Sequence, residues 1–305
     1  MIEEGRVDLR LGTSTLVATT SHVEECPDLG PQCSSSTPPT AYRHHVKMWM
    51  NETALDGSYG LTPWLAVEGR FALRLVDVTP TYFELDGTPK QVPNDIHHHN
   101  ETIFGPGDPW LLLRTGARSG KLVSSTRVGV TLPLGSTVPD PYELGREGKS
   151  HEHIQFGTGT VIPVVGGGIG YGVGNVDLAA SVLGLFSLYD NGEGFRAPSR
   201  FFASTRATLH FEGNKLAPFV AADFAHESRE RWHGASGDES YVRNDILAGG
   251  GLGWSFAPTW QAEIGLRLRA ANLSTGATLD YPGVLQLSIA THLDTVATVA
   301  HAHQH

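Results

Sequence analysis

Apolar and polar residues alternate along most of this chain. Between Gln261 and Ala270, the apolar residues Ala262, Ile264 and Leu266 are each followed by a polar residue or glycine. Side chains on a strand point alternately to opposite faces, so a period of two predicts a two-faced β-strand. The pattern recurs about a dozen times, in runs of roughly ten residues, which is the spacing that a transmembrane barrel needs. We therefore expect an all-β fold.

The connections between these runs are alternately short and long. Short turns are predicted at 60–63, 174–175 and 212–215, and long loops near 18–42, 80–106 and 135–150. Twelve strands follow from this pattern, at about 6–17, 45–59, 65–75, 108–115, 126–132, 153–171, 177–189, 201–211, 216–228, 245–256, 260–273 and 284–293. We predict a single antiparallel up-and-down transmembrane β-barrel over 1–293, with short periplasmic turns, long extracellular loops and a His-rich tail at 294–305.

Composition supports a membrane location. Charged residues make up 18% of the chain, below the roughly 25% of soluble proteins. No stretch reaches the roughly 20 apolar residues of a membrane helix, so strands closed into a barrel must cross the lipid. Two aromatic girdles are expected at the strand ends, one at Tyr59, Trp64, Phe211, Phe219, Trp254, Phe256 and Trp260 and the other at Trp49, Trp110, Tyr189, Phe201 and Trp232. These features predict the bacterial outer membrane, with its lipid as a partner.

Charge and cysteine content narrow the partners and the compartment. The net charge of −10 argues against nucleic acid, because binding phosphates requires clustered Lys and Arg. Cys26 and Cys33 lie in a Pro/Ser-rich loop, where they predict one small disulfide in an oxidising compartment or, alternatively, two unpaired thiols. Met1 and Ile2 run almost directly into a strand without a signal peptide, and we interpret this start as that of a trimmed sequence.

Four segments resemble a known family of bacterial outer-membrane channels. They are Tyr59-Gly-Leu-Thr-Pro63, Gly105-Pro-Gly-Asp-Pro109, Gly129-Val-Thr-Leu-Pro-Leu-Gly135 and His153-Ile-Gln-Phe-Gly-Thr-Gly-Thr160. The family is known as meta-pathway phenol-degradation or simply "transporter" proteins, and the resemblance covers roughly 45–293. It implies a barrel that passes small molecules, and it brings no catalytic residues with it. The chain departs from such barrels in its last strand, which ends at Leu293 without the usual terminal aromatic residue.

Ten of the fifteen histidines gather at the end where the long loops meet the strands. Neutral imidazole binds zinc and copper, and neighbouring carboxylates could add oxygen ligands. These residues predict a divalent transition-metal site for Zn or Cu at the extracellular mouth, with candidate ligands His44, His45, His97, His98, His99, His151, His153, Glu101 and Asp108. The alternative is that these histidines are solvated loop residues with no metal.

The polar face of the strands is expected to line the lumen. Its charged residues include Arg70, Arg74, Arg114, Arg127, Arg206, Glu263, Arg267 and Arg269. Charges of both signs in a narrow lumen can pair within the wall or can line a polar path. Val128, Val130, Ile264, Leu266, Leu285 and Leu287 are expected to face lipid.

Catalytic motifs are weak. Gly166–Gly172 lacks the Lys-Ser/Thr ending of a phosphate loop, and Asp223 and His226 fall on opposite strand faces. We therefore predict a channel or transporter for small molecules or metal ions with a histidine-rich mouth, and not an enzyme. Two alternatives remain: a hydrophobic-compound channel with incidental histidines, or a structural or surface-binding barrel without transport.

Overall fold

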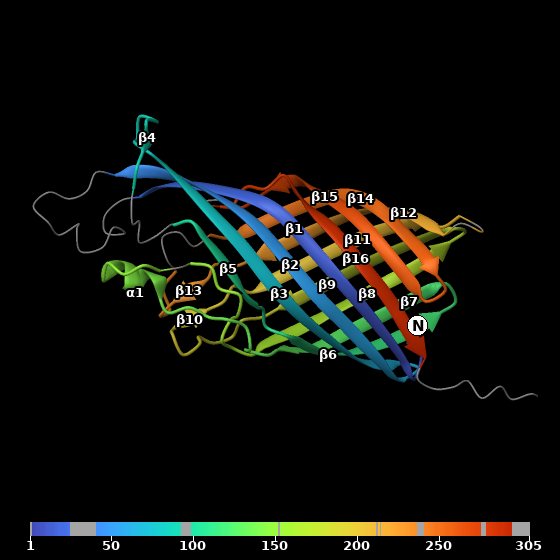
Figure 1. The fold of residues 1–305 in the computed structure, drawn as a ribbon. Coiled ribbons are helices and arrows are strands. Elements are labelled where there is room, and N and C mark those ends of the chain that lie inside the picture. The colour runs from blue at the N-terminus through green and yellow to red at the C-terminus, as the bar shows by residue number, and fades with distance from the viewer. Residues whose placement is uncertain are drawn as a thin grey trace, which may run out of the picture.

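The chain forms a closed, twelve-stranded antiparallel barrel, as the alternation predicts. The computed structural model describes residues 2–24, 41–92, 99–151, 153–211, 213, 215–236, 241–275 and 279–294. The wall strands are β1 (Arg6–Glu24), β2 (Tyr42–Thr62), β3 (Leu65–Phe83), β6 (Trp110–Ser119), β7 (Leu122–Thr131), β8 (Ile162–Val173), β9 (Val176–Leu185), β11 (Arg200–Leu209), β12 (Leu216–Glu227), β14 (Arg243–Ala257), β15 (Trp260–Asn272) and β16 (Gly283–Asp294). The first strand, β1, pairs with both β2 and β16, which closes the sheet (Figure 1).

The first and last wall strands start and finish at the same end of the barrel. Arg6 at the start of β1 is opposite Asp294 at the finish of β16. The short turns, such as the one after Val173, share this end, while α1 (Pro141–Arg146), β10 (Phe195–Arg196) and β13 (Arg231–Trp232) lie at the other (Figure 1). The predicted asymmetry of short turns and long loops is therefore confirmed.

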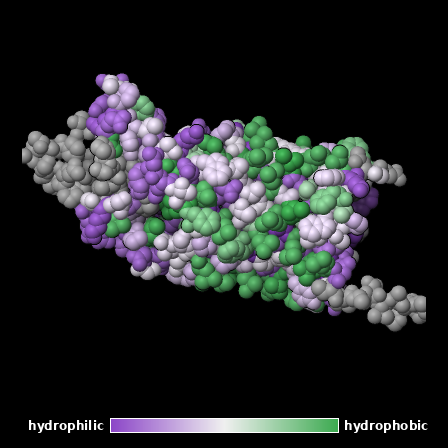
Figure 2. All heavy atoms as spheres, in the orientation of Figure 1, coloured by the Kyte–Doolittle hydropathy of each residue, from purple (hydrophilic) through white to green (hydrophobic). Residues whose placement is uncertain are grey.

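An apolar belt covers the outside of the barrel. Leu266 on β15 is 47% exposed, whereas its chain neighbour Arg267 is 6% exposed and faces inward. Green apolar side chains gather over the middle of the barrel in Figure 2, and polar ones gather toward the loop end. Val128, Ile264, Leu285 and Leu287 are exposed on the same outer face, as expected. A closed barrel satisfies its own backbone and meets lipid with apolar side chains, so the fold is that of an outer-membrane barrel.

No helix in the described part of the chain is long and apolar enough to cross a membrane.

The expected loop at 80–106 is shorter than predicted. The structure extends β3 to Phe83, pairs β4 (Pro89–Lys90) with its end, and adds β5 (Glu101–Pro106) beside it. Both β5 and β6 pair with β3, so they form one wall strand with a break at 107–109. Pro109 has no N–H for a ladder bond, which is one physical reason for the break.

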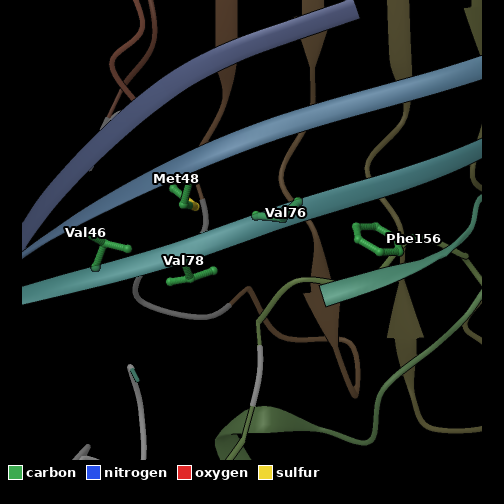
Figure 3. Packing of buried hydrophobic residues seen from close by; sticks show 5 residues of the cluster. All are labelled: Val46, Met48, Val76, Val78 and Phe156. Carbon is green, nitrogen blue, oxygen red and sulfur yellow. The ribbon is translucent and has the colours of Figure 1, made fainter. Parts of the chain in front are cut away.

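The prediction of a strand from His153 is wrong, because β8 begins at Ile162. The preceding segment enters the barrel instead. Phe156 packs against Val46 and Met48 of β2 and Val76 and Val78 of β3, all of them buried (Figure 3). Burial of these apolar groups holds the segment in the lumen, and such a contact between distant segments has no period in the sequence.

Hydrogen bonds to Asp108 fix the same segment to the break in the wall. Its carboxylate accepts bonds from the Gly135 N–H at 2.8 Å, the Thr158 N–H at 2.8 Å and the Thr158 hydroxyl at 2.7 Å. Asp108 therefore connects both ends of the long β7–β8 connection to the β5–β6 wall strand. In the described structure, the carboxylate of Asp108, a predicted metal ligand, accepts hydrogen bonds from the protein.

Three predicted girdle aromatics lie elsewhere. Phe219 is 4% exposed and faces the lumen, and Trp110 also lines an inner cavity. Trp232 of β13 is buried against Phe195 of β10, with their rings 4.8 Å apart, and Tyr142 of α1 packs against this pair. An aromatic residue near a strand end therefore marks the lipid interface only when its position in the period of two places it on the outer face.

Candidate functional site

The lumen carries an arginine-rich wall on one side. We use the term arginine wall for eight inward-facing residues of β1, β2, β3, β6 and β7: Arg10, Glu52, Asp56, Glu68, Arg70, Arg74, Arg114 and Arg127. Each carboxylate is shared by two guanidinium groups. Glu52 lies 2.6 Å from Arg70 and 2.8 Å from Arg74. Five arginines thus meet three carboxylates in this wall.

The other two carboxylates of the arginine wall repeat this sharing. Asp56 lies 2.8 Å from Arg70 and 3.9 Å from Arg10. Glu68 lies 2.6 Å from Arg114 and 2.7 Å from Arg127. Because the side chains of these residues keep some accessible surface inside the barrel, their unused N–H groups remain available to a solute.

The opposite side of the lumen pairs its charges one to one. Arg206 of β11 lies 2.8 Å from Glu263 of β15, and Arg267 lies 2.9 Å from Asp223 of β12. The Phe219 ring lies between the two arginines, 3.7 Å from the Arg206 guanidinium carbon and 5.3 Å from that of Arg267. These cation–π contacts hold both arginines against the wall.

A third charged group lies nearer the loops. Asp245 is fully buried and lies 2.6 Å from Arg243 and 2.8 Å from Arg269. The Tyr281 ring lies within 5.2 Å of both guanidinium carbons. Burial raises the pKa of the Tyr281 hydroxyl above its ordinary value. The structure thus places all eight arginine and glutamate residues expected in the lumen on its inner face, each with a partner at 2.9 Å or less.

Two chambers lie along the lumen. The turn-side chamber has a volume of about 570 Å³ and is lined by residues that include Asp56, Arg70 and Arg127. The loop-side chamber has a volume of about 300 Å³. Its lining combines apolar residues, among them Val46, Met48, Met50, Val78, Ile154 and Leu279, with polar ones, among them Glu227, Glu230 and Arg243. The volume of the turn-side chamber is typical of ligand cavities, and that of the loop-side chamber is at the lower limit of their range.

The Glu52–Arg74 ion pair lies between the two chambers. On β2, Glu52 comes after Met50 of the loop-side chamber and before Asp56 of the turn-side chamber. Arg74 also donates to the Phe156 carbonyl at 3.2 Å. The inserted segment and this ion pair therefore lie between the two chambers along β2.

The structure separates the predicted metal-ligating histidines. His44 is buried on the inner face of β2, where its Nε2 lies 3.0 Å from Nδ1 of His22, whereas His45 lies on the outer face against Phe83. His99 contacts Glu101 at 3.5 Å. The alternation of β2 is the physical reason that adjacent histidines cannot share a site there.

His151 and His153 have rings 5.2 Å apart, and Nδ1 of His151 lies 2.9 Å from the Lys149 carbonyl. Within the described residues, the groups of three close metal-ligand atoms include none of the predicted ligands. His97 and His98 lie outside the described residues, as do Cys26, Cys33 and the tail from residue 295. A Zn or Cu site at those histidines and the disulfide stay predictions.

The lumen residues that were not among the inner-face residues expected from the sequence include Glu52, Asp56, Trp110 and Phe219. Glu52 and Asp56 have the same parity as Met48 and Met50 on β2, so an unbroken period of two through 42–62 would have placed them inward. Phe219 and Trp110 could have been placed in the same way. Both of these aromatic residues were instead expected in the aromatic girdles.

The comparisons with known proteins establish the fold. No known family model and no curated protein matches the sequence. The structure is similar to the COG4313 outer membrane channel from Pseudomonas putida F1, with a TM-score of 0.60 and 12% identity over 96% of this chain and 97% of that one. The Pseudomonas putida toluene transporter TodX matches at a TM-score of 0.43 and 8% identity, over 96% and 90%. The first likeness shows an outer-membrane barrel fold, and it does not test the phenol-degradation name of the resembled family.

Proposed function

We propose that this protein is an outer-membrane channel that passes small solutes through the barrel lumen. The observation that carries the proposal is the pair of chambers along the lumen, about 300 and 570 Å³ in volume, with the inserted segment and the Glu52–Arg74 ion pair between them. A barrel that served only as a scaffold would have no need of cavities of ligand size in series. The likeness to a solved outer membrane channel supports the same role.

The apolar lining of the loop-side chamber favours solutes with an apolar part. Met48 and Met50 lie in this lining, and methionine adapts its flexible side chain to ligands of different shape. This observation favours the hydrophobic-compound alternative over a channel for metal ions. The histidines then act as local structural residues, as His44 does beside His22.

Single-channel conductance in a planar bilayer tests the proposal. The purified wild-type barrel should give discrete current steps in KCl. Phe156→Ala should raise the conductance, because it removes a ring of the segment that narrows the lumen. The matched control is Phe104→Ala, which removes an outward-facing ring that is 65% exposed and should leave the current unchanged. A folded wild-type barrel without current, together with a silent Phe156→Ala variant, would instead favour the structural alternative.

A further inference from the structure

We propose that the turn-side chamber is a binding site for small organic anions with an apolar body, such as an aromatic carboxylate. The proposal rests on the channel function above and deepens it by naming a class of solute. The chamber brings together a surplus of guanidinium groups and an apolar surface within one cavity of about 570 Å³.

The surplus of arginine provides the anion specificity. Arg70 and Arg127 both line the chamber. Arg127 shares Glu68 with Arg114, whereas Arg70 lies beside both Glu52 and Asp56, and each of these carboxylates also contacts a second arginine. Arg114 neutralises the charge of Glu68, so Arg127 can donate some of its N–H groups to a solute. Guanidinium binds carboxylate through charge-assisted hydrogen bonds, which are about twice as strong as neutral ones. On the opposite side of the lumen, Arg206 and Arg267 each have a carboxylate of their own, so these two arginines offer no such surplus.

The apolar surface provides the second half of the site. Trp110 and Leu112 of β6 and Leu183 of β9 line the same chamber as Arg127. The Arg70 guanidinium carbon lies 5.8 Å from the centre of the Trp110 ring, so the charged and aromatic surfaces adjoin. An aromatic carboxylate can therefore place its carboxylate at the arginines and its ring against Trp110 and the two leucines.

Glycine on the neighbouring strand leaves room for such a body. Gly129 of β7 is paired with Leu112, and Gly166 of β8 is paired with Leu183. Both glycines occupy inward-facing positions of their strands. A Cβ at Gly166 would lie 2.7 Å from a Leu183 methyl group, and one at Gly129 would lie 2.8 Å from a Leu112 methyl group. The two leucines therefore lie flat along the wall, and the chamber stays open beside them.

The test is a binding titration followed by tryptophan fluorescence on the full-length barrel in detergent. Benzoate is the probe, benzyl alcohol keeps the ring without the charge, and acetate keeps the charge without the ring. Benzoate should bind roughly tenfold or more tighter than either, which is the contribution expected of one charge-assisted hydrogen bond or of the buried ring. Equal binding of benzoate and benzyl alcohol would overturn the anion specificity.

Arg127→Gln should weaken benzoate binding by about tenfold or more, while Glu68 keeps Arg114 as its partner. Arg127→Lys, which retains the charge, should restore most of the affinity and covers the case in which the glutamine variant folds poorly. Arg146→Gln changes an exposed arginine of α1 and should bind as wild type does. Wild-type affinity in a folded Arg127→Gln variant would refute the assignment.

Conductance separates this inference from the proposed function. Benzoate should interrupt the KCl current of the wild-type channel and should interrupt that of Arg127→Gln much less. A conducting channel whose current benzoate does not affect would contradict the binding site and leave the channel function intact. Benzoate binding by a barrel that carries no current would contradict the channel function and support the site.

Discussion

A charge placed on the lipid face of the barrel should destabilise it according to depth in the bilayer. Leu266 lies six positions along β15 from Trp260, which is 40% exposed at the turn end. At about 3.4 Å per residue and a strand tilt of about 40°, Leu266 lies roughly 15 Å from that rim. Because the apolar band is about 25 Å tall, this position is near its middle.

Leu266→Arg should therefore lower the free energy of unfolding by about 2–4 kcal/mol. The same change at Leu293, an exposed outer residue beside the turn-end rim, should cost only about 0–1 kcal/mol. Arg267→Ala should cost about 1–2 kcal/mol, because it removes a buried partner of Asp223, which keeps the Ser204 hydroxyl at 2.5 Å.

Urea titration of the barrel folded into lipid vesicles measures all three differences. Tryptophan fluorescence and the heat-modifiable gel mobility of a folded barrel give two independent probes of the transition. The expected order of destabilisation is Leu266→Arg first, then Arg267→Ala and Leu293→Arg. If Leu266→Arg unfolded at the wild-type urea concentration, Leu266 would not be in contact with the lipid interior, and the outward assignment of this face would fail.

Two further changes test the inside of the barrel. Phe219→Ala should cost about 3 kcal/mol and should raise single-channel conductance less than Phe156→Ala does, since its ring lies against the wall between two arginines; a rise as large as that of Phe156→Ala would show that Phe219 limits the current instead. Asp108→Ala should ease local opening of the inserted segment by about 1–3 kcal/mol, because it leaves donors of Gly135 and Thr158 unpaired. Hydrogen exchange at the Thr158 amide measures this, with Asp86→Ala in an exposed turn as the control; equal exchange in all three proteins would contradict the role of Asp108.

The faces of the wall strands could be predicted because lipid imposes a period of two. Outward positions in mid-barrel are predominantly apolar, so Ile264 and Leu266 contrast with Arg267 without any knowledge of the partner strands. The same rule assigns the inner face and therefore most of the charged lumen. Strand lengths were less predictable, since β3 continues past Pro80 because β2 provides a partner out to Tyr42.

The chambers could not be predicted, because they depend on contacts between segments far apart in the sequence. Phe156 follows a segment with no alternation, and its burial against β2 and β3 depends on the path of the whole β7–β8 connection. The sharing of Glu68 by Arg114 and Arg127 depends on the register of three strands. A sequence pattern gives the face of a residue, whereas register and loop insertion decide its neighbours.

The glycine-rich segment 166–172 illustrates why composition alone could not reveal its role. The missing Lys-Ser/Thr ending argues against a phosphate loop, yet glycine has no side chain and so gives no sign of which face it occupies. On β14 the equivalent residue Gly251 is opposite Phe219, and a Cβ there would lie 2.4 Å from the ring. Glycine is therefore required where a lumen side chain lies flat against the neighbouring strand. The same relation holds for Gly166 and Leu183. Glycines on both strands therefore leave space in the lumen, and the alternation of apolar and polar residues does not reveal this role.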